Sequence, residues 1–397
     1  MPARCRCLFS IALGLAVAAP APAPQPETPA RVPSGERTPA ESIRQRLESH
    51  IHEAGAPGAT CALLLPDDSA LALAAGVSDR KARTPMAPTD RMLSGSIGKT
   101  YCAAIALLLA EQGRLDLDAP ISTYLGDMAW FDRLPSARDL TTRMLLNHTA
   151  GLREHVTSPD FTAALRDDPD KAWTPEELLA FALDEPALFP AGQGWAYADT
   201  NFIVVGLILE RLTGRSYNDL LRERLLEPLD LDATEPSDRP DLPGLVPGYT
   251  APDNPFHLPE QTATPGRYWM NPQFEYTGGG TITTSLDLAR WARLLYAGDV
   301  LTPGSRDQML NAVPARLGPG VRYGLGTIIW PSSHGDVVGH AGWFPGFVSI
   351  VCHYPDLGVT IAYQQNTDVG ADLGGLRRLL DDLVELSTGA AVLPPTP

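Results

Sequence analysis

The chain has 397 residues, of which 44% are apolar, so it is long enough to bury a large core in one or two domains. Its 47 Asp and Glu residues outnumber 31 Lys and Arg residues, which gives a net charge of -16 at pH 7. Because no run of basic residues interrupts this acidity, the composition argues against a nucleic-acid-binding protein.

The first segment has the pattern of an export signal. Two arginines precede an apolar run from Leu8 to Ala19, and Ala16-Val17-Ala18 suits a signal-peptidase cleavage site. The apolar run is too short to span a bilayer. We therefore predict a signal peptide over residues 1–18, a Pro-rich tether over residues 19–37, and an exported protein, periplasmic or secreted, without a membrane span.

The next segments predict a helix, a hairpin and a second helix. The residues from Thr38 read Thr-Pro-Ala-Glu, which is a capping box with proline at the first helical position. Two apolar runs, 59–66 and 70–77, flank three polar turn residues and indicate a β-hairpin. The stretch 101–113 is apolar on every side and ends at a glycine, which is typical of a buried helix.

Helical patterns joined by Pro- and Gly-rich loops then dominate, and strand patterns return near the end. The final third contains four runs typical of strands and one terminal helix: 323–330, 336–342, 347–355, 358–366 and 373–387. Strands at both ends with helices between them predict an α/β fold of the α+β type, with an antiparallel sheet built from both termini. We assign the sheet domain to residues 38–114 and 279–388, an inserted all-helical domain to 115–278, and a tail to 389–397.

The cysteines and histidines do not predict a metal site. Cys5 and Cys7 leave with the signal peptide, so the mature chain keeps Cys61, Cys102 and Cys352. We expect these three to be small buried side chains rather than disulfide partners. The sequence has neither Cys-x-x-Cys nor His-Glu-x-x-His, and we expect no metal and no organic cofactor.

The stretch Leu-Ser-Gly-Ser-Ile-Gly-Lys-Thr-Tyr, residues 93–101, allows three interpretations. A P-loop requires glycine at position 93, where Leu93 stands, and a buried strand before it, where the sequence is polar and Pro-containing. A nucleophile elbow requires glycine at position 94, where Ser94 stands. The third interpretation is Ser-x-x-Lys, with the Ser96 hydroxyl and the Lys99 amine one helical turn apart.

Lysine is rare in this chain, which strengthens the third interpretation. Lys99 is one of three lysines among 31 basic residues. Arginine does not release its proton in proteins, whereas a buried lysine can. Because residues three apart on a helix face the same side, a neutral Lys99 could accept the proton of Ser96 in nucleophilic catalysis. The alternative is that Lys99 is exposed to solvent. The helix is apolar on every side within three residues of Lys99, however, so it has no exposed face for an ammonium group.

Five segments in chain order resemble the penicillin-recognising serine hydrolases, which include class C β-lactamases, D-Ala-D-Ala carboxypeptidases and related esterases. The segments are 93–125 with Ser-Ile-Gly-Lys, 140–152 with His-Thr-Ala-Gly-Leu, 189–214 with Tyr-Ala-Asp, 278–295 with Gly-Gly-Gly-Thr, and 323–347 with His-Ala-Gly. The resemblance runs from about residue 38 to residue 366. It implies a site in the cleft between the sheet domain and the helical domain.

The resemblance implies roles for the first two motifs. Ser96 would be the nucleophile at a helix N-terminus, where the dipole stabilises negative charge. Lys99 would act as a neutral base or would hold Tyr197 in a basic state. Asp199 stands where the family usually has asparagine. An aspartate accepts from Lys99 and adds a negative charge beside it, but it cannot donate to a substrate carbonyl.

The third motif would bind substrate. His340 stands where class C β-lactamases carry lysine, and it would face a substrate carboxylate or assist proton movement; histidine is cationic only near or below its usual pKa of ~6.5. Gly342 would let the strand approach the substrate. The amides of Trp343 and Ser96 would form the oxyanion hole. We expect His148 to be a structural histidine in a turn.

These observations predict an exported serine hydrolase that works through a Ser96 acyl-enzyme. We expect D-Ala-D-Ala carboxypeptidase-like activity on peptidoglycan peptides, because His340 favours it over β-lactamase activity. The alternatives are a carboxylesterase on small acyl esters, a class C-like β-lactamase, and a penicillin-binding protein without turnover. The expected partner is a small acyl or peptide substrate, with no nucleic acid, and we expect a monomer.

Overall fold

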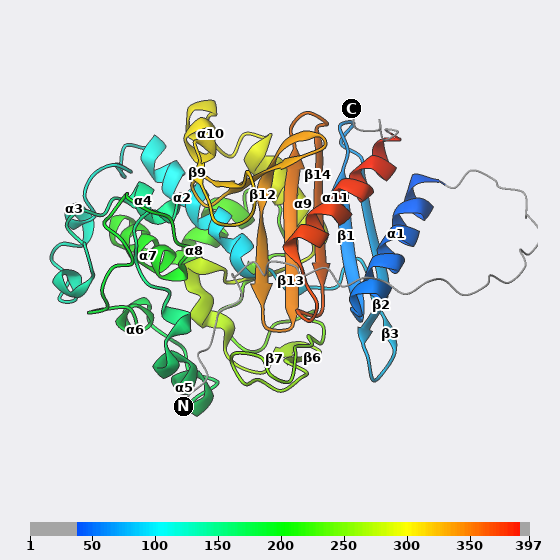
Figure 1. The fold of residues 1–397 in the computed structure, drawn as a ribbon, viewed down its shortest axis with the longest axis horizontal. Helices are drawn as coiled ribbons and strands as arrows, with labels where there is room; N and C mark the ends of the chain where they lie inside the picture. Colours follow the sequence, from blue (N-terminus) through cyan, green and yellow to red (C-terminus); the bar gives the residue numbers. More distant parts are fainter. Residues whose placement is uncertain (1–37, 390–397) are drawn as a thin grey trace, which may run out of the picture.

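The computed structural model describes residues 38–389. The signal peptide and tether expected over residues 1–37, and all but the first residue of the expected tail, lie outside the described residues. One side of the molecule is built around a large sheet and the other side is mostly helical (Figure 1).

The large sheet has nine strands in the order β3-β2-β1-β14-β13-β12-β11-β10-β9, and all its neighbours are antiparallel. Its strands are β1 (Gly58–Leu64), β2 (Ala70–Asp79), β3 (Thr84–Pro85), β9 (Val313–Pro314), β10 (Arg322–Tyr323), β11 (Ile328–Ser332), β12 (Gly335–Phe344), β13 (Phe347–Tyr354) and β14 (Val359–Gln365). Because β1 pairs with β14, segments from both ends of the chain meet in the sheet. The predicted fold class is confirmed.

Helices cover both faces of this sheet. Helices α1 (Pro39–Ala54) and α11 (Leu373–Thr388) pack on one face, in a core that includes Cys61. The next residue of β1, Ala62, points to the opposite core with α2 (Gly98–Glu111) and α9 (Ser285–Tyr296), because side chains alternate along a strand. Every residue of β1 is therefore buried. The capping box at Thr38 is present, with both of its hydrogen bonds.

Helices are the main regular elements of the inserted region, but most of its residues lie in turns and loops, so it is not all-helical as expected. Its helices are α3 (Ser122–Leu125), α4 (Thr142–Leu146), α5 (Pro159–Asp167), α6 (Pro175–Ala180), α7 (Asp199–Thr213) and α8 (Tyr217–Leu221), and α10 (Pro303–Leu310) follows later in the chain. A small sheet joins β5 (Glu235–Pro236) to β8 (Thr281–Thr283) and β4 (Met92–Leu93), and β6 (Ala263–Thr264) pairs with β7 (Arg267–Tyr268). Dense proline and glycine between residues 235 and 272 keep that segment out of helices. The domain boundaries stay predictions.

The run 323–330 forms two strands rather than the single strand expected. Strands β10 and β11 pair as a hairpin, and the chain reverses between them. Gly326 has φ 67°, a conformation that favours glycine, and a Cβ added to it would lie 2.9 Å from the Lys99 carbonyl oxygen. The reversal therefore packs directly against the helix that carries Lys99.

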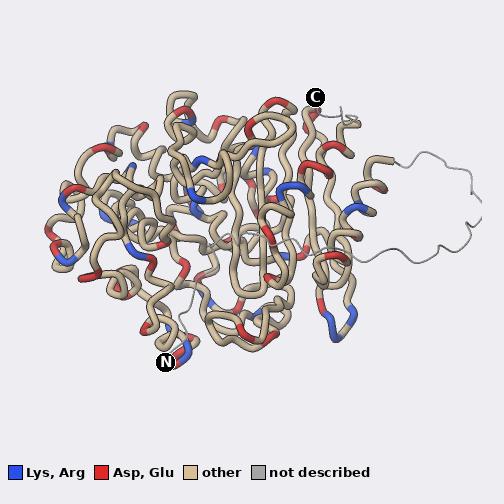
Figure 2. Tube along the Cα trace, in the orientation of Figure 1, with Lys and Arg blue, Asp and Glu red and all other residues tan. Residues whose placement is uncertain are grey.

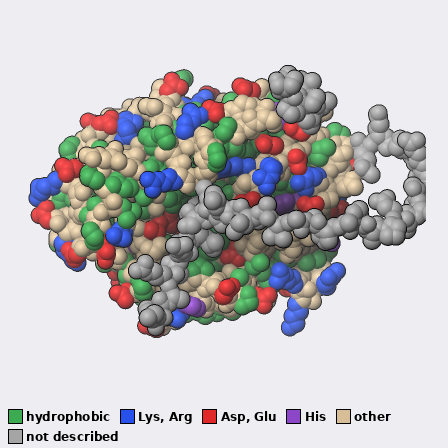
Figure 3. All heavy atoms as spheres, viewed as in Figure 1, with side chains coloured by type: hydrophobic (Ala, Val, Ile, Leu, Met, Phe, Trp, Pro, Cys, Tyr) green, Lys and Arg blue, Asp and Glu red, His purple; other side chains and the backbone are tan. Residues whose placement is uncertain are grey.

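Acidic and basic residues are spread along the trace on both the sheet side and the helical side of the molecule (Figure 2). On the face shown in Figure 3, acidic, basic and apolar side chains are intermingled. Within residues 38–389, none of the helices combines the length and the apolar character that crossing a membrane requires.

Candidate active site

Ser96 lies where the chain enters the buried helix α2. Residues Gly95–Ile97 form a 3-10 turn that runs directly into the helix. Gly95 and Ile97 are buried, whereas Ser96 is partly exposed. The Ser96 hydroxyl is thus accessible at the N-terminal end of a 14-residue helix, where the helix dipole favours a developing negative charge.

The Lys99 side chain is fully buried and surrounded by oxygen atoms. Its Nζ lies 2.9 Å from Ser96 Oγ, 2.5 Å from Asp199 Oδ1 and 2.5 Å from the Gly278 carbonyl oxygen. It also lies 4.9 Å from the centre of the Tyr197 ring. Three acceptors match the three N–H donors of an ammonium group, and the Asp199 carboxylate favours that charged form. A neutral amine also fits the same contacts, because its lone pair can accept from the Ser96 hydroxyl. The ammonium form must lose a proton before Lys99 can act as a base.

A strained turn holds the Gly278 carbonyl against Lys99. Tyr276 has φ 44° and ψ -119°, a backbone conformation that costs a residue with a side chain about 1–3 kcal/mol. A Cβ added to Gly98 would collide with the carbonyl of Gly279, so these two backbones touch directly. Close packing of glycines therefore fixes the acceptor beside the ammonium group.

Tyr197 lies two residues before the first residue of helix α7 and is hydrogen-bonded to Ser96. Burial raises the pKa of the Tyr197 phenol well above its usual value of 10.0. The carboxylates of Asp199, Glu154 and Glu275 raise this pKa further, and the bond with Ser96 lowers it. The phenol is therefore neutral in this arrangement and is not a base held in its anionic form.

Asp199 is the first residue of α7, and its side chain is 25% exposed. The preceding residue, Ala198, has no side chain that could cap the helix. Glu154 takes that role, because its Oε2 accepts the Asp199 N–H at 2.7 Å. The Glu154 carboxylate therefore fixes the backbone from which the Lys99 partner projects.

A third carboxyl group, that of Glu275, lies nearby. Its Oε2 accepts the Gly280 N–H at 2.9 Å. Burial, together with the Asp199 carboxylate, raises the pKa of Glu275 to about 8, against the opposing effects of the Gly280 bond and Lys99. The surroundings of Lys99 thus hold three carboxyl groups, those of Asp199, Glu154 and Glu275.

His340 is buried, and both of its ring nitrogens are occupied. Nδ1 lies 2.6 Å from the Ala341 carbonyl oxygen, and Nε2 lies 2.8 Å from the Tyr323 hydroxyl. A carbonyl can only accept, so Nδ1 carries the proton and Nε2 accepts from Tyr323. Burial, together with the nearby Lys99, lowers the pKa of His340 to about 3, against the opposing effect of the Ala341 bond. In this arrangement the ring offers no positive charge to a substrate carboxylate, in contrast to the role that the resemblance implies.

The end of β12 that carries Gly342 packs against the turn at Ser96. Strand β11 pairs with β12 only as far as Gly339, so it does not cover this end. A Cβ added to Gly342 would collide with the Ser94 carbonyl and lie 3.1 Å from the Ser96 nitrogen. A Cβ added to Gly95 would lie 2.7 Å from the Trp343 nitrogen. The two amides expected to form the oxyanion hole therefore lie at the same backbone contact.

The sequence profile of the family described as Beta-lactamase matches residues 43–385. This chain belongs to the Beta-lactamase family. It is 28% identical to Penicillin-binding protein 4 of Amycolatopsis lactamdurans over 385 residues, covering 88% of this chain and 90% of that protein. It is 24% identical over 307 residues to a penicillin-binding protein of Bacillus subtilis, covering 74% of this chain but only 64% of that relative.

Two solved structures resemble this Beta-lactamase family member over most of its length. One is a D-stereospecific amidohydrolase from Streptomyces sp., with a TM-score of 0.75, 28% identity, and coverage of 89% of this chain and 99% of that chain. The other is D-amino acid amidase from Ochrobactrum anthropi SV3 complexed with L-phenylalanine, with a TM-score of 0.76, 25% identity, and coverage of 88% and 99%. The resemblance noted in the sequence is confirmed, and the chain is a serine hydrolase of the Beta-lactamase family.

Several residues near Ser96 in this Beta-lactamase family member were not singled out from the sequence. They are Glu154, Glu275, Gly278 and Tyr323. Glu154 stands two residues after the His-Thr-Ala-Gly-Leu segment, and Glu275 stands just before three consecutive glycines. A triple glycine indicates close backbone packing, so it could have drawn attention to its neighbours.

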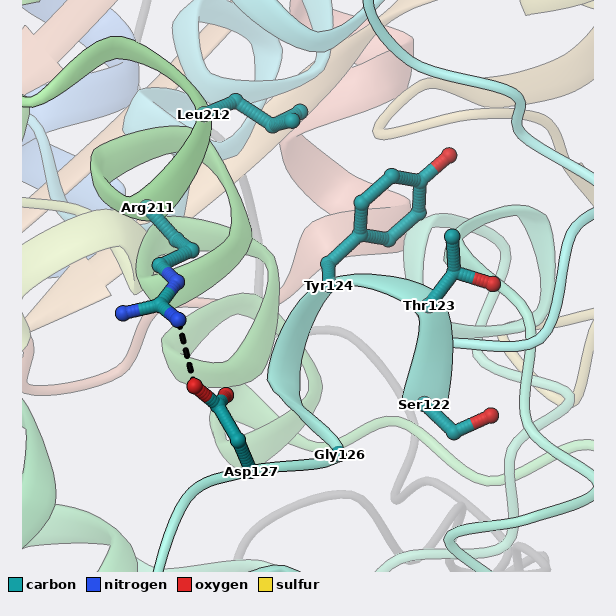
Figure 4. A pocket seen from close by; sticks show the side chains of 7 residues that line it. All are labelled: Ser122, Thr123, Tyr124, Gly126, Asp127, Arg211 and Leu212. Atoms are coloured by element: carbon teal, nitrogen blue, oxygen red, sulfur yellow. Dashed lines mark hydrogen bonds and ion pairs between the residues drawn. The ribbon is translucent and has the colours of Figure 1, made fainter.

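Outside this site, the described residues offer no second set of catalytic groups that we recognise. No cluster of His, Cys, Asp and Glu among residues 38–389 could hold a metal ion, and the three mature cysteines are buried and unpaired. A separate pocket lies beside α3 and the end of α7, where Arg211 bonds to Asp127 at 2.5 Å (Figure 4). Its lining shares no residue with the surroundings of Ser96.

Proposed function

We propose that this serine hydrolase cleaves the amide bond that follows a D-amino acid residue with a free ammonium group, through a Ser96 acyl-enzyme. The observation that carries the proposal is the charge around the nucleophile. Lys99 is already paired with Asp199 at 2.5 Å, and His340 is neutral. Glu275, with a pKa of about 8, is mostly neutral at pH 7, but the Asp199 carboxylate is 25% exposed and Glu154 lies against its backbone. Because Lys99 is already paired, an ammonium group on the substrate would be favoured there over a carboxylate.

The two similar solved structures support an amide as the bond that is cleaved and a D configuration of the substrate. The names of the two similar structures are D-stereospecific amidohydrolase and D-amino acid amidase. Both names describe hydrolysis of amides at D-configured centres. Those activities belong to those proteins, and they lend support to the same reaction class for this chain.

The contacts around Ser96 suggest a path for the protons during acylation. Lys99 passes one ammonium proton to Asp199, and its free amine accepts the Ser96 proton while Oγ bonds to the substrate carbonyl carbon. The amides of Ser96 and Trp343 donate to the developing oxyanion. The proton held by Lys99 then moves to the leaving nitrogen as the C–N bond breaks. Water hydrolyses the acyl-enzyme by the reverse proton transfers, with the Tyr197 phenol orienting Ser96.

A second candidate is ester hydrolysis. Trp343 is partly exposed, and the Phe256 ring stacks on it with centroids 6.1 Å apart. Such an aromatic wall suits an apolar acyl or aryl group. The D-Ala-D-Ala carboxypeptidase specificity expected from the sequence ranks below both, because its substrate ends in a carboxylate that finds no cation at His340.

A substrate panel separates these functions. The panel is D-phenylalanine amide, its N-acetyl derivative, L-phenylalanine amide, a peptide ending in D-Ala-D-Ala, and p-nitrophenyl acetate, with Ser96→Ala as control. The proposal requires cleavage of D-phenylalanine amide and a loss of about tenfold or more in kcat/KM on N-acetylation, equivalent to about 1.4 kcal/mol. Equal kcat/KM values for D-phenylalanine amide and its N-acetyl derivative would contradict the proposal. Cleavage of the D-Ala-D-Ala peptide alone would contradict it as well.

Export and a monomeric state are further proposals that rest on the sequence. The segment that carries the export signal lies outside the described residues. N-terminal sequencing of protein recovered from the periplasm or medium should show that residues 1–18 are missing. Sedimentation of the mature protein should give the mass of a single chain, and a larger mass would contradict the monomer.

A further inference from the structure

We propose that His148 is a positioning residue that fixes Tyr197 against Ser96, by accepting hydrogen bonds from the backbone N–H groups of Ala196 and Ala198, the two neighbours of that tyrosine. The inference rests on the serine hydrolase mechanism proposed above, because it concerns how Tyr197 orients the nucleophile. The sequence predicts only a structural histidine in a turn. The hydrogen bonds of His148 to the residues beside Tyr197 indicate a more specific role.

His148 makes backbone contacts with both neighbours of Tyr197. The Ala196 N–H donates to the His148 carbonyl oxygen at 3.1 Å. The Ala198 N–H donates to the His148 Nδ1 at 3.3 Å. The Asn201 side-chain amide also lies 3.0 Å from Nδ1 and holds the ring in place. The loop segment that carries Tyr197 therefore cannot shift along the chain direction without breaking a bond to this one histidine.

These contacts determine the tautomer of the ring. A backbone N–H can only donate, so Nδ1 is an acceptor and the proton of the neutral ring is on Nε2. Protonation of Nδ1 would break both bonds. Burial lowers the pKa of His148 well below 6.5, and the nearby Lys99 acts in the same direction. The acceptor is thus present throughout the usual pH range.

The His148 ring also links two motifs. It packs on the Tyr197 ring with centroids 4.2 Å apart, and on the Tyr323 ring at 4.7 Å. Tyr323 in turn bonds to Nε2 of His340 at 2.8 Å. A chain of contacts therefore runs from the second motif to the third through this ring, which is itself fully buried.

The backbone of His148 is adapted to this position. Its φ is 63°, in the left-handed region that few residues with a side chain enter, and asparagine, aspartate and histidine are the most frequent among those that do. The Oδ1 of asparagine occupies the same branch position as the Nδ1 of histidine. Asparagine at this site therefore retains both the backbone conformation and the acceptor, whereas phenylalanine retains the ring and loses the acceptor.

A pair of variants, His148→Asn and His148→Phe, tests the proposal. The readout is the rate at which a fluorophosphonate labels Ser96, measured by intact mass and normalised to the folded fraction from circular dichroism. Because a shift of about 1 Å in an active-site group can cost about 100-fold, we expect His148→Phe to label about 10–100-fold more slowly than the wild type. We expect His148→Asn to stay within about threefold, and KM for D-phenylalanine amide to change less than kcat in both.

Each outcome decides a different point. If the wild type is not labelled at all, the proposed function fails rather than this inference. Equal labelling rates for His148→Phe and the wild type, or slower labelling of His148→Asn than of His148→Phe, would overturn the positioning role. If His148→Phe does not fold, Asn201→Leu removes one of the two donors to Nδ1, the side-chain amide that holds the ring, and should slow labelling about three- to tenfold. A wild-type rate in that variant would overturn the proposal equally.

Discussion

Replacing Lys99 with arginine keeps a positive charge in place but removes a group that can release its proton. The Lys99 Nζ lies 2.9 Å from Ser96 Oγ, within direct reach of the hydroxyl proton. Loss of a positioned general base typically costs about 10²–10⁴-fold in rate, or about 3–5 kcal/mol in activation free energy. The larger guanidinium must also fit a fully buried position, which should cost about 1–3 kcal/mol of folding stability.

The assay combines kcat for D-phenylalanine amide with the free energy of unfolding from urea titration, so that lost activity is separated from lost folding. Lys171→Arg is the matched control, because Lys171 is partly exposed and pairs with Glu177 at 3.0 Å. It should change kcat less than twofold and stability by less than about 0.5 kcal/mol. A folded Lys99→Arg variant with more than half of the wild-type kcat would refute the proton-accepting lysine.

Three further variants test the charges of the protein. Asp199→Asn should lower the preference for D-phenylalanine amide over its N-acetyl derivative about tenfold in kcat/KM, and an unchanged ratio would contradict the charge argument. Burial raises the pKa of Glu275 from 4.5 to about 8, so its stabilising effect is present at low pH and is lost as pH rises toward 8. In urea titrations, the free energy of unfolding of Glu275→Gln should therefore rise by about 1–3 kcal/mol relative to that of the wild type between pH 5 and pH 9. A difference in unfolding free energy that does not change with pH would argue against a buried carboxyl group. Burial lowers the pKa of His353 from 6.5 to about 4, so its neutral form stabilises the fold above pH 6.5 and this is lost as pH falls. Between pH 7 and pH 5 the wild type should lose about 1–2 kcal/mol more stability than His353→Gln, and equal losses would show that His353 is not buried in its neutral form.

The sequence predicts the sheet because its strands are marked by local patterns. Apolar runs separated by turn residues place β1, β2, β13 and β14 close to their observed bounds. The short strands of the inserted region, such as β5 and β6, have two residues each and are fixed by contacts with distant segments. No local pattern of that length distinguishes a strand from a loop, so they could not be predicted.

The site was predictable where a motif places residues on one helix or strand. Ser96 and Lys99 are one turn apart, so their contact follows from helix geometry. The protonation states do not follow from the motifs. The neutral ring of His340 depends on burial and on Tyr323, 17 residues away in sequence. Similarly, the charge environment of Lys99 depends on Glu275, which only the folded chain brings near.

The formation of a covalent bond at Ser96 is the most direct test of the mechanism. Intact-mass spectrometry of the wild type after incubation with a fluorophosphonate should show one added label, and peptide mapping should place it on Ser96. A penicillin should react more slowly, because its carboxylate faces the carboxyl groups near Lys99 rather than a cation. A label that persists in Ser96→Ala, or a folded wild type that takes up no label from either reagent, would contradict the account.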